Sequence, residues 1–498
     1  MTVAAVVVVC LVTVLVSLFG LRVARSTRDF YVASRRVSPR MNASALAGEY
    51  ISAASFLGVA GLIVAEGSYG LWYPLGYTAG CLTMLLFMTG PLRRSGAYTV
   101  PDFVSLRFSS SRLRVLTVML VVLTGWLYII PQLHGAALVA STAAGLPPWA
   151  GPVIVVLVVM ATVMPGGMRS VTIAQAVQYW IKFCALLVPL VFILLQLGLL
   201  EPGTLANGQR PDFSAVWQEE TAGAATEFYR TVSLILALML GTIGLPHVLV
   251  RFYTNPDGDA ARRTTFLLLV LLTGFYVLPV ALGVIARGVL TQEADLGSPD
   301  SALLQLPGAV FAGAGADVLT AVVAGGAFAA FLSTTSGLVV SVSGVLSQEF
   351  FGGTVRGFRI GAVLAGALPL ALATATTHVP LAGAVAMVFT FTASSLAPLL
   401  LLGIWWSKIT AQGAVAGMVT GAAASLGSLG LALVLGSRTP GGEATVQADG
   451  ALVLLQYPAP WCVPLAFAVT VLVSRLGTGK PPANTERVLA RLHLPENP

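Results

Sequence analysis

Gly48-Glu-Tyr-Ile-Ser-Ala53 interrupts an apolar stretch that would otherwise be typical of a single membrane-spanning helix. A carboxylate or a hydroxyl at mid-membrane depth is costly, and backbone that leaves the helix there persists only where protein or a cavity surrounds it. The stretch Gly241-Thr-Ile-Gly-Leu-Pro246 has the same character much later in the chain. Two broken helices in corresponding halves of a chain indicate a site that binds an ion and a solute.

The composition predicts an all-α polytopic membrane protein. Of the 498 residues, 56% are hydrophobic and only 9% are charged, with a mean hydropathy of +0.88. Soluble proteins carry about 25% charged residues. The sequence contains no His/Cys/Asp cluster, phosphate loop or nucleophile elbow. We therefore expect neither an enzyme nor a bound cofactor, and the coupling ion is a substrate rather than a cofactor.

Apolar segments predict about thirteen transmembrane helices, because each is long enough to cross the hydrocarbon core. Their approximate spans are 3–23, 43–65, 70–92, 114–142, 148–165, 172–200, 229–249, 265–290, 318–348, 357–377, 380–405, 411–436 and 453–475. No cation precedes the first span and no cleavage site follows it, so we expect this helix to be retained.

The positive charges predict the orientation. Of the 27 Lys and Arg residues, all but Arg210, Arg230, Arg287 and Arg438 fall in segments on one side of these spans. That side is expected to be cytoplasmic. The sequence thus predicts a multi-pass plasma-membrane protein with its N-terminus outside and its C-terminus inside. The same bias explains the high pI without nucleic acid as a partner, and the Gly/Ala-rich, Arg-rich composition favours a bacterial source.

Six motifs occur in order along the chain: Asp29–Arg36, Ala47–Gly58, Tyr98–Phe103, Gly166–Met168, Gly244–Phe252 and Trp406–Ala414. At this spacing they resemble the sodium:solute symporter family over essentially residues 29–430. Within the family the chain is most similar to the cation/acetate symporters, because Gly244-Leu-Pro-His-Val-Leu-Val-Arg-Phe252 favours that branch over the sugar and proline branches.

The resemblance implies a LeuT-like core of five plus five helices in an inverted repeat, with one helix before it and two after. Four regions are then expected: an N-terminal helix and cytoplasmic loop, the first repeat with its outer loop, the second repeat, and a last helix with a cytoplasmic tail. They correspond to residues 1–42, 43–228, 229–436 and 437–498. The implied activity is secondary active transport by alternating access, driven by an inward sodium gradient.

The resemblance also implies a sodium site. Its ligands would be the carbonyls of Gly48, Ile51 and Ala330 and the side-chain oxygens of Ser333 and Thr334. Sodium is a hard cation that prefers oxygen ligands, which an unwound helix and facing hydroxyls can supply. The alternative is that these hydroxyls only bond their own helix.

The chain departs from the family pattern at a further cation site. Sugar- and proline-type members carry an aspartate after the Gly-Gly turn, where Gln175 stands here. A neutral amide cannot replace a carboxylate as a charged ligand. A single cation site is therefore the simpler expectation.

A monocarboxylate can be held by the free N–H groups of half-helix N-termini. Five polar residues in or near the breaks are candidates to line the solute site, although each also suits helix packing. They are Tyr50, Ser52, Gln132, Thr242 and Thr392.

Two titratable residues are candidates for a proton or gating role. Glu49 could repel an anion, carry a proton or pair with a cation, or form an interhelical hydrogen bond. His247 directly follows the second break and could act in gating or simply pack.

The favoured hypothesis is sodium-coupled symport of a small monocarboxylate, acetate first, by a monomer. Pyruvate, propionate or an amino acid remains an alternative solute, and a proton an alternative coupling ion. A membrane sensor without transport is the alternative of another class. The short tail Gly477–Pro498 leaves little room for a signalling domain, which weakens it.

Overall fold

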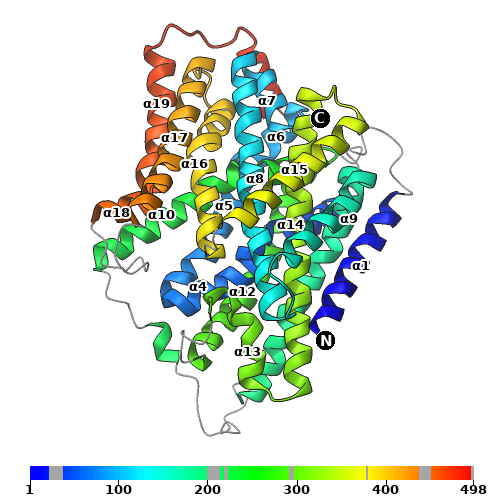
Figure 1. Ribbon diagram of the computed structural model, residues 1–498. Helices are drawn as coiled ribbons and strands as arrows, with labels where there is room; N and C mark the ends of the chain where they lie inside the picture. The colour runs from blue at the N-terminus through cyan, green and yellow to red at the C-terminus, as the bar shows by residue number, and fades with distance from the viewer. Residues whose placement is uncertain are drawn as a thin grey trace. The chain divides into compact units, whose positions relative to one another are not determined.

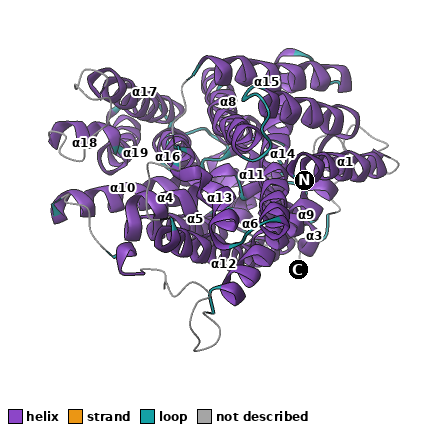
Figure 2. Cartoon of the chain, turned by 60° about the horizontal axis from the view of Figure 1, so that its bottom comes forward, coloured by secondary structure: helices purple, strands orange, loops and turns teal. Residues whose placement is uncertain are grey.

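The computed structural model describes residues 1–21, 37–198, 213–217, 223–290, 297–376, 380–436 and 450–494. Within these ranges the chain forms helices, short 3-10 and π turns and loops, and no strand (Figure 2). The all-α prediction is confirmed. The motif Asp29–Arg36 lies outside the described residues, as do residues 201–212 and 218–222 of the outer loop expected after the first repeat.

In the described part of the chain, 11 helices are long and apolar enough to cross a membrane. Two of them contain parts of more than one predicted span. Ala54–Phe87 runs from one predicted span into the next, and α9 (Ala150–Gln196) covers the spans 148–165 and 172–200. Within α9, Gly167 has non-helical angles, with φ 54° and ψ −150°. The count of about thirteen and the inverted repeat stay predictions.

By its internal contacts the chain divides into two compact units, each made of three separate stretches. Unit 1 comprises residues 1–74, 125–218 and 270–385, and unit 2 comprises residues 75–124, 219–269 and 386–498. The two predicted five-helix repeats are consecutive along the chain, so these units do not coincide with them.

Unit 1 is built around a long helix, α14 (Ala314–Phe350), which is buried through most of its length. Five helices pack against it. They are α1 (Thr2–Leu21), α9 and α15 (Val355–Ala375), which are labelled in Figure 1, together with α3 (Pro39–Tyr50) and α13 (Ala302–Val310). Small residues permit this close packing. A Cβ at Gly326, for example, would overlap the Cβ of Ala185 in α9.

Further elements of unit 1 are η2 (Ala54–Gly58), α4 (Val59–Glu66), η3 (Gly67–Leu71), η4 (Phe213–Val216), η6 (Pro299–Ser301), residues 125–142 of α8 (Ser111–Thr142) and residues 270–289 of α12 (Gly258–Val289).

Unit 2 contains the two helices on either side of the second break, and a pair of helices that pack along each other. α10 (Ala224–Ile243) is followed by α11 (Pro246–Phe252), while α17 (Ala411–Gly436) packs along α19 (Ala459–Leu476). Its other elements are α5 (Trp72–Phe87), α6 (Thr89–Ser95), α7 (Val100–Phe108), α16 (Leu381–Trp405), α18 (Gly450–Gln456) and α20 (Thr485–His493), some of which begin in unit 1.

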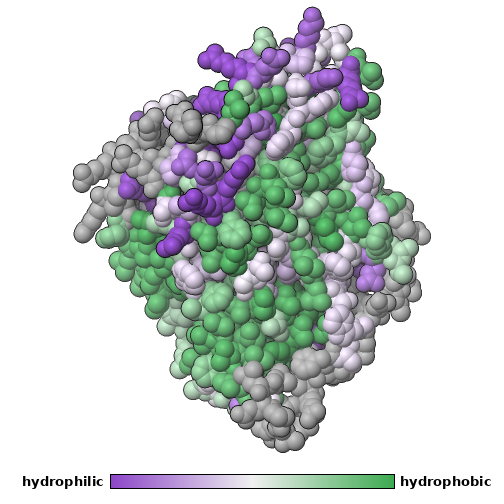
Figure 3. All heavy atoms as spheres, turned by 180° about the vertical axis from the view of Figure 1, so that it is seen from behind, coloured by the Kyte–Doolittle hydropathy of each residue, from purple (hydrophilic) through white to green (hydrophobic). Residues whose placement is uncertain are grey.

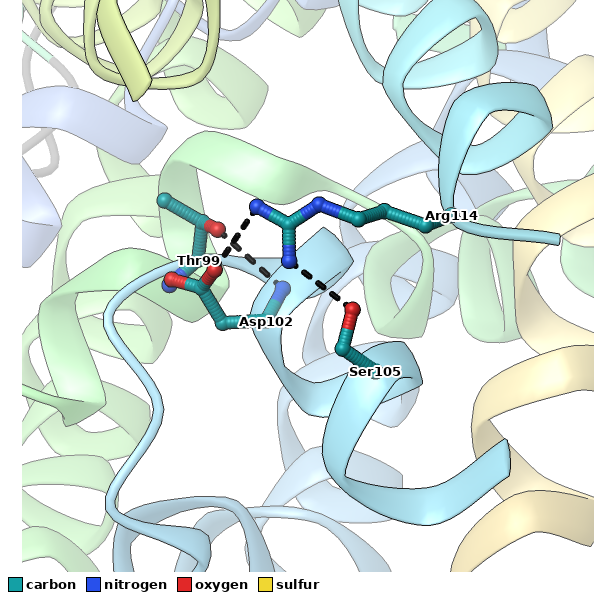
Figure 4. Close-up of polar contacts among 4 residues, drawn as sticks. All are labelled: Thr99, Asp102, Ser105 and Arg114. Carbon is teal, nitrogen blue, oxygen red and sulfur yellow. Dashed lines mark hydrogen bonds and ion pairs between the residues drawn. The ribbon is translucent and has the colours of Figure 1, made fainter. Parts of the chain in front are cut away.

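The motif Tyr98–Phe103 has a local structural role in unit 2. Thr99 and Asp102 form a capping box at the start of α7, with the Asp102 N–H donating to Thr99 Oγ1 at 3.3 Å. Arg114 then donates to Asp102 Oδ1 at 3.2 Å and to Ser105 Oγ at 2.8 Å (Figure 4). The motif therefore fixes the direction in which α7 leaves its loop.

The outer surface suits a bilayer. On the face drawn in Figure 3, hydrophobic side chains form a broad area and hydrophilic ones gather toward one end. In α1, the apolar residues Val8, Leu11, Leu15 and Phe19 are exposed. Such exposure is expected where lipid replaces water as the surrounding medium.

A buried carboxyl group in unit 1 makes stability depend on pH. Asp300 lies in η6, outside the candidate spans, and accepts a hydrogen bond from the Leu381 N–H at 2.8 Å. Burial raises its pKa from 3.8 to about 6, although the Leu381 N–H acts in the opposite direction. Since the folded pKa exceeds the unfolded one, its contribution to stability is fully present below pH 3.8 and is lost as pH rises through about 6.

We therefore expect Asp300→Asn to flatten the pH profile of thermal stability. As the pH rises from 3.8 to about 6, the free energy of unfolding of the wild type should fall by up to about 3 kcal/mol relative to that of the variant. In this pH range the folded state binds more protons at Asp300 than the unfolded state does. The melting temperature of the purified protein in detergent, measured across this pH range, tests this. Asp317→Asn, at an exposed position, is the control. Parallel wild-type and Asp300→Asn profiles would contradict it.

Candidate functional site

The first broken helix lies where the sequence predicts it. α3 ends at Tyr50, Ile51 has extended angles (φ −72°, ψ 92°), and the helix resumes through the π turn η2 into α4. The carbonyl groups at the end of α3 therefore lose their helical partners. The helix break predicted for the stretch 48–53 is confirmed.

A lysine side chain contacts the freed carbonyl groups. Lys182, in the middle of α9, is fully buried. Its Nζ donates hydrogen bonds to Gly48 O, to Ile51 O at 2.8 Å and to Ser333 Oγ at 2.6 Å. Three acceptors from α3, its C-cap and α14 thus surround one ammonium group.

Hydroxyl groups of α14 bind the same segment. Ser333 Oγ lies 2.8 Å from Gly48 O and 3.0 Å from Ala330 O. Thr334 Oγ1 donates to Glu49 O at 2.7 Å and lies 3.4 Å from Ile51 O. The structure therefore brings together all five residues predicted as sodium ligands, and it places the Lys182 ammonium against three of them.

Glu49 is fully buried beside this cluster. Its carboxyl group packs on Gly337 of α14, where an added Cβ would overlap Oε1 and lie 2.7 Å from Cγ. It also interacts electrostatically with Lys182. The two buried groups carry opposite charges when ionised, so each offsets part of the desolvation cost of the other.

Gln175 of α9 forms a hydrogen bond to α14 next to this cluster. Its Nε2 donates to Ser333 O at 2.7 Å, so the amide holds the backbone next to the cluster. Behind it, α3 and α9 are in backbone contact: a Cβ at Gly48 would overlap Gln175 O. The Gln175 amide thus joins two helices.

Among the predicted solute-lining residues of unit 1, Gln132 has a clear structural contact. Its Oε1 accepts the Ala53 N–H at 2.8 Å, which satisfies a donor that the break leaves without a helical partner. Ser52 Oγ is buried and has no hydrogen-bond partner within the described part of the chain. Tyr50 is buried too.

The second break lies in unit 2 and also matches the prediction. α10 ends at Ile243, Leu245 has extended angles (φ −78°, ψ 108°), and α11 begins at Pro246. Thr392 Oγ1 donates to Gly241 O at 3.1 Å, close to the break. Thr242 Oγ1 instead bonds Leu238 O at 2.7 Å, within its own helix.

The predicted gating residue His247 is buried in the first turn of α11. Arg251 follows one helical turn later and is fully buried. Each of the two units therefore contains one of the two predicted helix breaks.

Sequence reasoning missed Lys182, which it counted only among the positive charges on the cytoplasmic side. The available signal was a single cation between Ile181 and Phe183 in an apolar segment. An ionisable residue within a membrane span indicates a functional site by default.

Comparisons with known proteins identify the class. The sequence profile of the sodium:solute symporter family matches residues 30–421. A monocarboxylic acid transporter of Corynebacterium glutamicum is 30% identical, over 93% of this chain and 89% of the relative. A Bacillus subtilis protein described as the uncharacterized symporter YwcA is 29% identical, over 94% of this chain and 93% of the relative.

Solved structures share the fold. A substrate-bound, outward-open Na+-coupled sialic acid symporter matches with a TM-score of 0.72 at 13% identity, over 97% of this chain and 99% of the other. MhsT in complex with L-phenylalanine matches with a TM-score of 0.57 at 12% identity, over 86% and 98%.

The family match and the curated relatives define a membrane transporter rather than an enzyme. The chain belongs to the sodium:solute symporter family. The family prediction made from the ordered motifs is confirmed.

Proposed function

We propose that this protein is a secondary active symporter that moves a small monocarboxylate together with a monovalent cation by alternating access. The observation that carries the proposal is the interrupted α3, whose freed carbonyl groups meet the hydroxyls of Ser333 and Thr334 on α14. Interrupted backbone inside a membrane helix is tolerated at sites that bind ions and solutes.

A monocarboxylate is the solute class that fits best. The relative from Corynebacterium glutamicum is named for monocarboxylic acids. The two breaks supply half-helix N-termini, which favour an anionic group without a dedicated arginine. Acetate is the first candidate, and pyruvate and propionate share its carboxylate. Tyr50, Ser52, Gln132, Thr242 and Thr392 remain the proposed lining residues.

The coupling cation has two candidates. Family membership supports sodium, with Gly48, Ile51, Ala330, Ser333 and Thr334 as ligands. The Lys182 ammonium, hydrogen-bonded to three of these five residues, favours the alternative in which sodium does not bind there. Glu49 and His247 keep their proposed proton or gating roles.

The proposed setting is the plasma membrane of a bacterium, with the N-terminus outside, the C-terminus in the cytoplasm and a monomer as the working unit. The excess of Lys and Arg in the predicted inner segments supports this orientation.

The test is labelled-acetate counterflow in proteoliposomes, in which unlabelled acetate inside draws labelled acetate in without any ion gradient. We expect counterflow that propionate and pyruvate inhibit and that an amino acid such as proline leaves unchanged. Accumulation under an imposed cation gradient would establish active transport. Flux of none of these solutes would contradict the proposal, and it would favour a sensor if the protein still bound acetate.

A further inference from the structure

The ammonium group of Lys182 matches its surroundings in number and kind of hydrogen bond. A lysine ammonium has three N–H donors and no acceptor. The acceptors around Nζ are two carbonyl oxygens, Gly48 O and Ile51 O, and one hydroxyl oxygen, Ser333 Oγ. Ser333 can accept from Nζ because its own O–H points to a carbonyl oxygen, with Gly48 O at 2.8 Å and Ala330 O at 3.0 Å. All three donors are therefore satisfied.

The oxygens that hold the ammonium are those that a sodium ion would need. Gly48 O, Ile51 O and Ser333 Oγ accept from Nζ, Ala330 O lies within hydrogen-bond distance of Ser333 Oγ, and Thr334 Oγ1 donates to Glu49 O. Sodium requires several oxygen ligands at once. No separate set of oxygens is left in this cluster for a second cation while Lys182 occupies it.

Charge points in the same direction. Two unit positive charges a few ångströms apart repel strongly in a buried site. From α3, Glu49 is the charged group that interacts with Lys182. The acidic residues of α14, Asp317 and Glu349, lie at its two ends, and α1 carries no charged side chain between Thr2 and Leu21. The single carboxylate of Glu49 can balance one positive charge, and the Lys182 ammonium already provides that charge.

The further cation site that the family resemblance implies also differs in this chain. Gln175 stands where sugar- and proline-type members have an aspartate, and its amide N–H is used by Ser333 O at 2.7 Å. A neutral group that donates to a carbonyl adds no negative charge to attract sodium. The local chemistry therefore disfavours sodium at both positions.

We propose that Lys182 is a tethered substitute for sodium, so that this site binds no sodium and solute transport does not require it. This inference assumes the monocarboxylate transport proposed above, but it does not assume that sodium is the coupling ion. Lys182 then acts as the residue that determines cation specificity: its ammonium holds α3, α9 and α14 together as a bound sodium would.

The first experiment uses the wild-type protein. Melting temperature in detergent is measured in NaCl and in choline chloride, and acetate counterflow is measured in the same two media. We expect no saturable rise in melting temperature with sodium, because a ligand that does not bind the folded state cannot stabilise it. Counterflow should have the same rate in both media.

Variants at position 182 make the test reciprocal. Lys182→Ala removes the ammonium and its stem and leaves the oxygens of Gly48, Ile51 and Ser333 available. We expect this variant to acquire a saturable, sodium-specific rise in melting temperature, and counterflow about tenfold faster in NaCl than in choline chloride. Lys182→Met fills the space without donating, so it should be slow in both media. Lys408→Ala, at an exposed lysine, should match the wild type.

The outcomes separate the two proposals. Saturable sodium stabilisation of the wild type, or wild-type counterflow that requires sodium, would overturn the role of Lys182 even if Lys182→Ala failed to fold. A Lys182→Ala protein that folds but gains no sodium response would overturn it too. Absence of acetate flux in every medium would instead remove the proposed solute, while the melting experiment would still decide whether sodium binds.

Discussion

Replacement of Gly48 by alanine is expected to impair acetate uptake severely. The added Cβ would overlap the carbonyl oxygen of Gln175, lie 3.0 Å from its carbonyl carbon and lie 3.4 Å from the Tyr179 nitrogen. These are backbone atoms of α9, which cannot turn aside as a flexible side chain can. Helices α3 and α9 would have to separate, and Gly48 O would move away from Lys182 Nζ. We expect uptake to fall at least tenfold, the change that corresponds to about 1.4 kcal/mol.

The measurement is counterflow and melting temperature of Gly48→Ala beside Gly274→Ala. Gly274 lies within α12 in the same unit, and a Cβ there meets no atom within 4 Å. Both changes raise intrinsic helix propensity by the same amount, about 1 kcal/mol. Gly274→Ala should therefore transport like the wild type. Wild-type uptake by Gly48→Ala would show that the close approach of α3 to α9 is not needed for function.

Sequence patterns predicted the interrupted helices well, because their cause is local. A glycine, a carboxylate and a hydroxyl in the run 48–53, or glycines and a proline in the run 241–246, conflict with a lipid-facing helix wherever they occur. The three hydroxyls from Ser333 to Thr335 were likewise conspicuous in an apolar helix. Membrane class, broken helices and family were all accessible in this way.

The contacts that define the site were not accessible, because they join distant segments. Lys182 meets Gly48 across 134 positions and Ser333 across 151. In a hydropathy average, the charge of Lys182 only lowers the value for its span. The average does not show which way the Lys182 side chain points. The same holds for Gln132, which was predicted to line the solute site and is seen to accept the Ala53 N–H.

Helix bounds were also uncertain where the chain bends without leaving the helix. The spans 148–165 and 172–200 are joined in α9, since Gly167 changes direction through positive φ within a hydrogen-bonded segment. The hydropathy profile dips at Pro165 and Gly166, and it would dip in the same way whether the chain bends there or forms a loop. The pattern therefore indicates where a helix changes course, but it does not distinguish a bend from a loop.

Thr334→Val is the second substitution for which we expect a large loss of transport. It acts on the carbonyl groups at the interrupted end of α3 and leaves the Lys182 ammonium in place. Valine keeps the shape of threonine and removes its hydroxyl. The carbonyl oxygens of Glu49 and Ile51, which lie 2.7 Å and 3.4 Å from Thr334 Oγ1, would lose this partner in a buried setting. An unsatisfied buried acceptor costs about 1–3 kcal/mol. We expect a lower melting temperature and about a tenfold loss of counterflow.

The neighbouring residue supplies a matched control. Thr335 is on the same helix and equally buried, but its Oγ1 has no hydrogen-bond partner among the residues that the structure describes. Thr335→Val therefore removes an unpaired hydroxyl and should be neutral or slightly stabilising. Equal losses in both variants would mean that crowding by valine, not the bond to Glu49 O, is responsible. A loss confined to Thr334→Val would mean that α14 fixes the interrupted end of α3 by a specific hydroxyl, independently of which cation occupies the site.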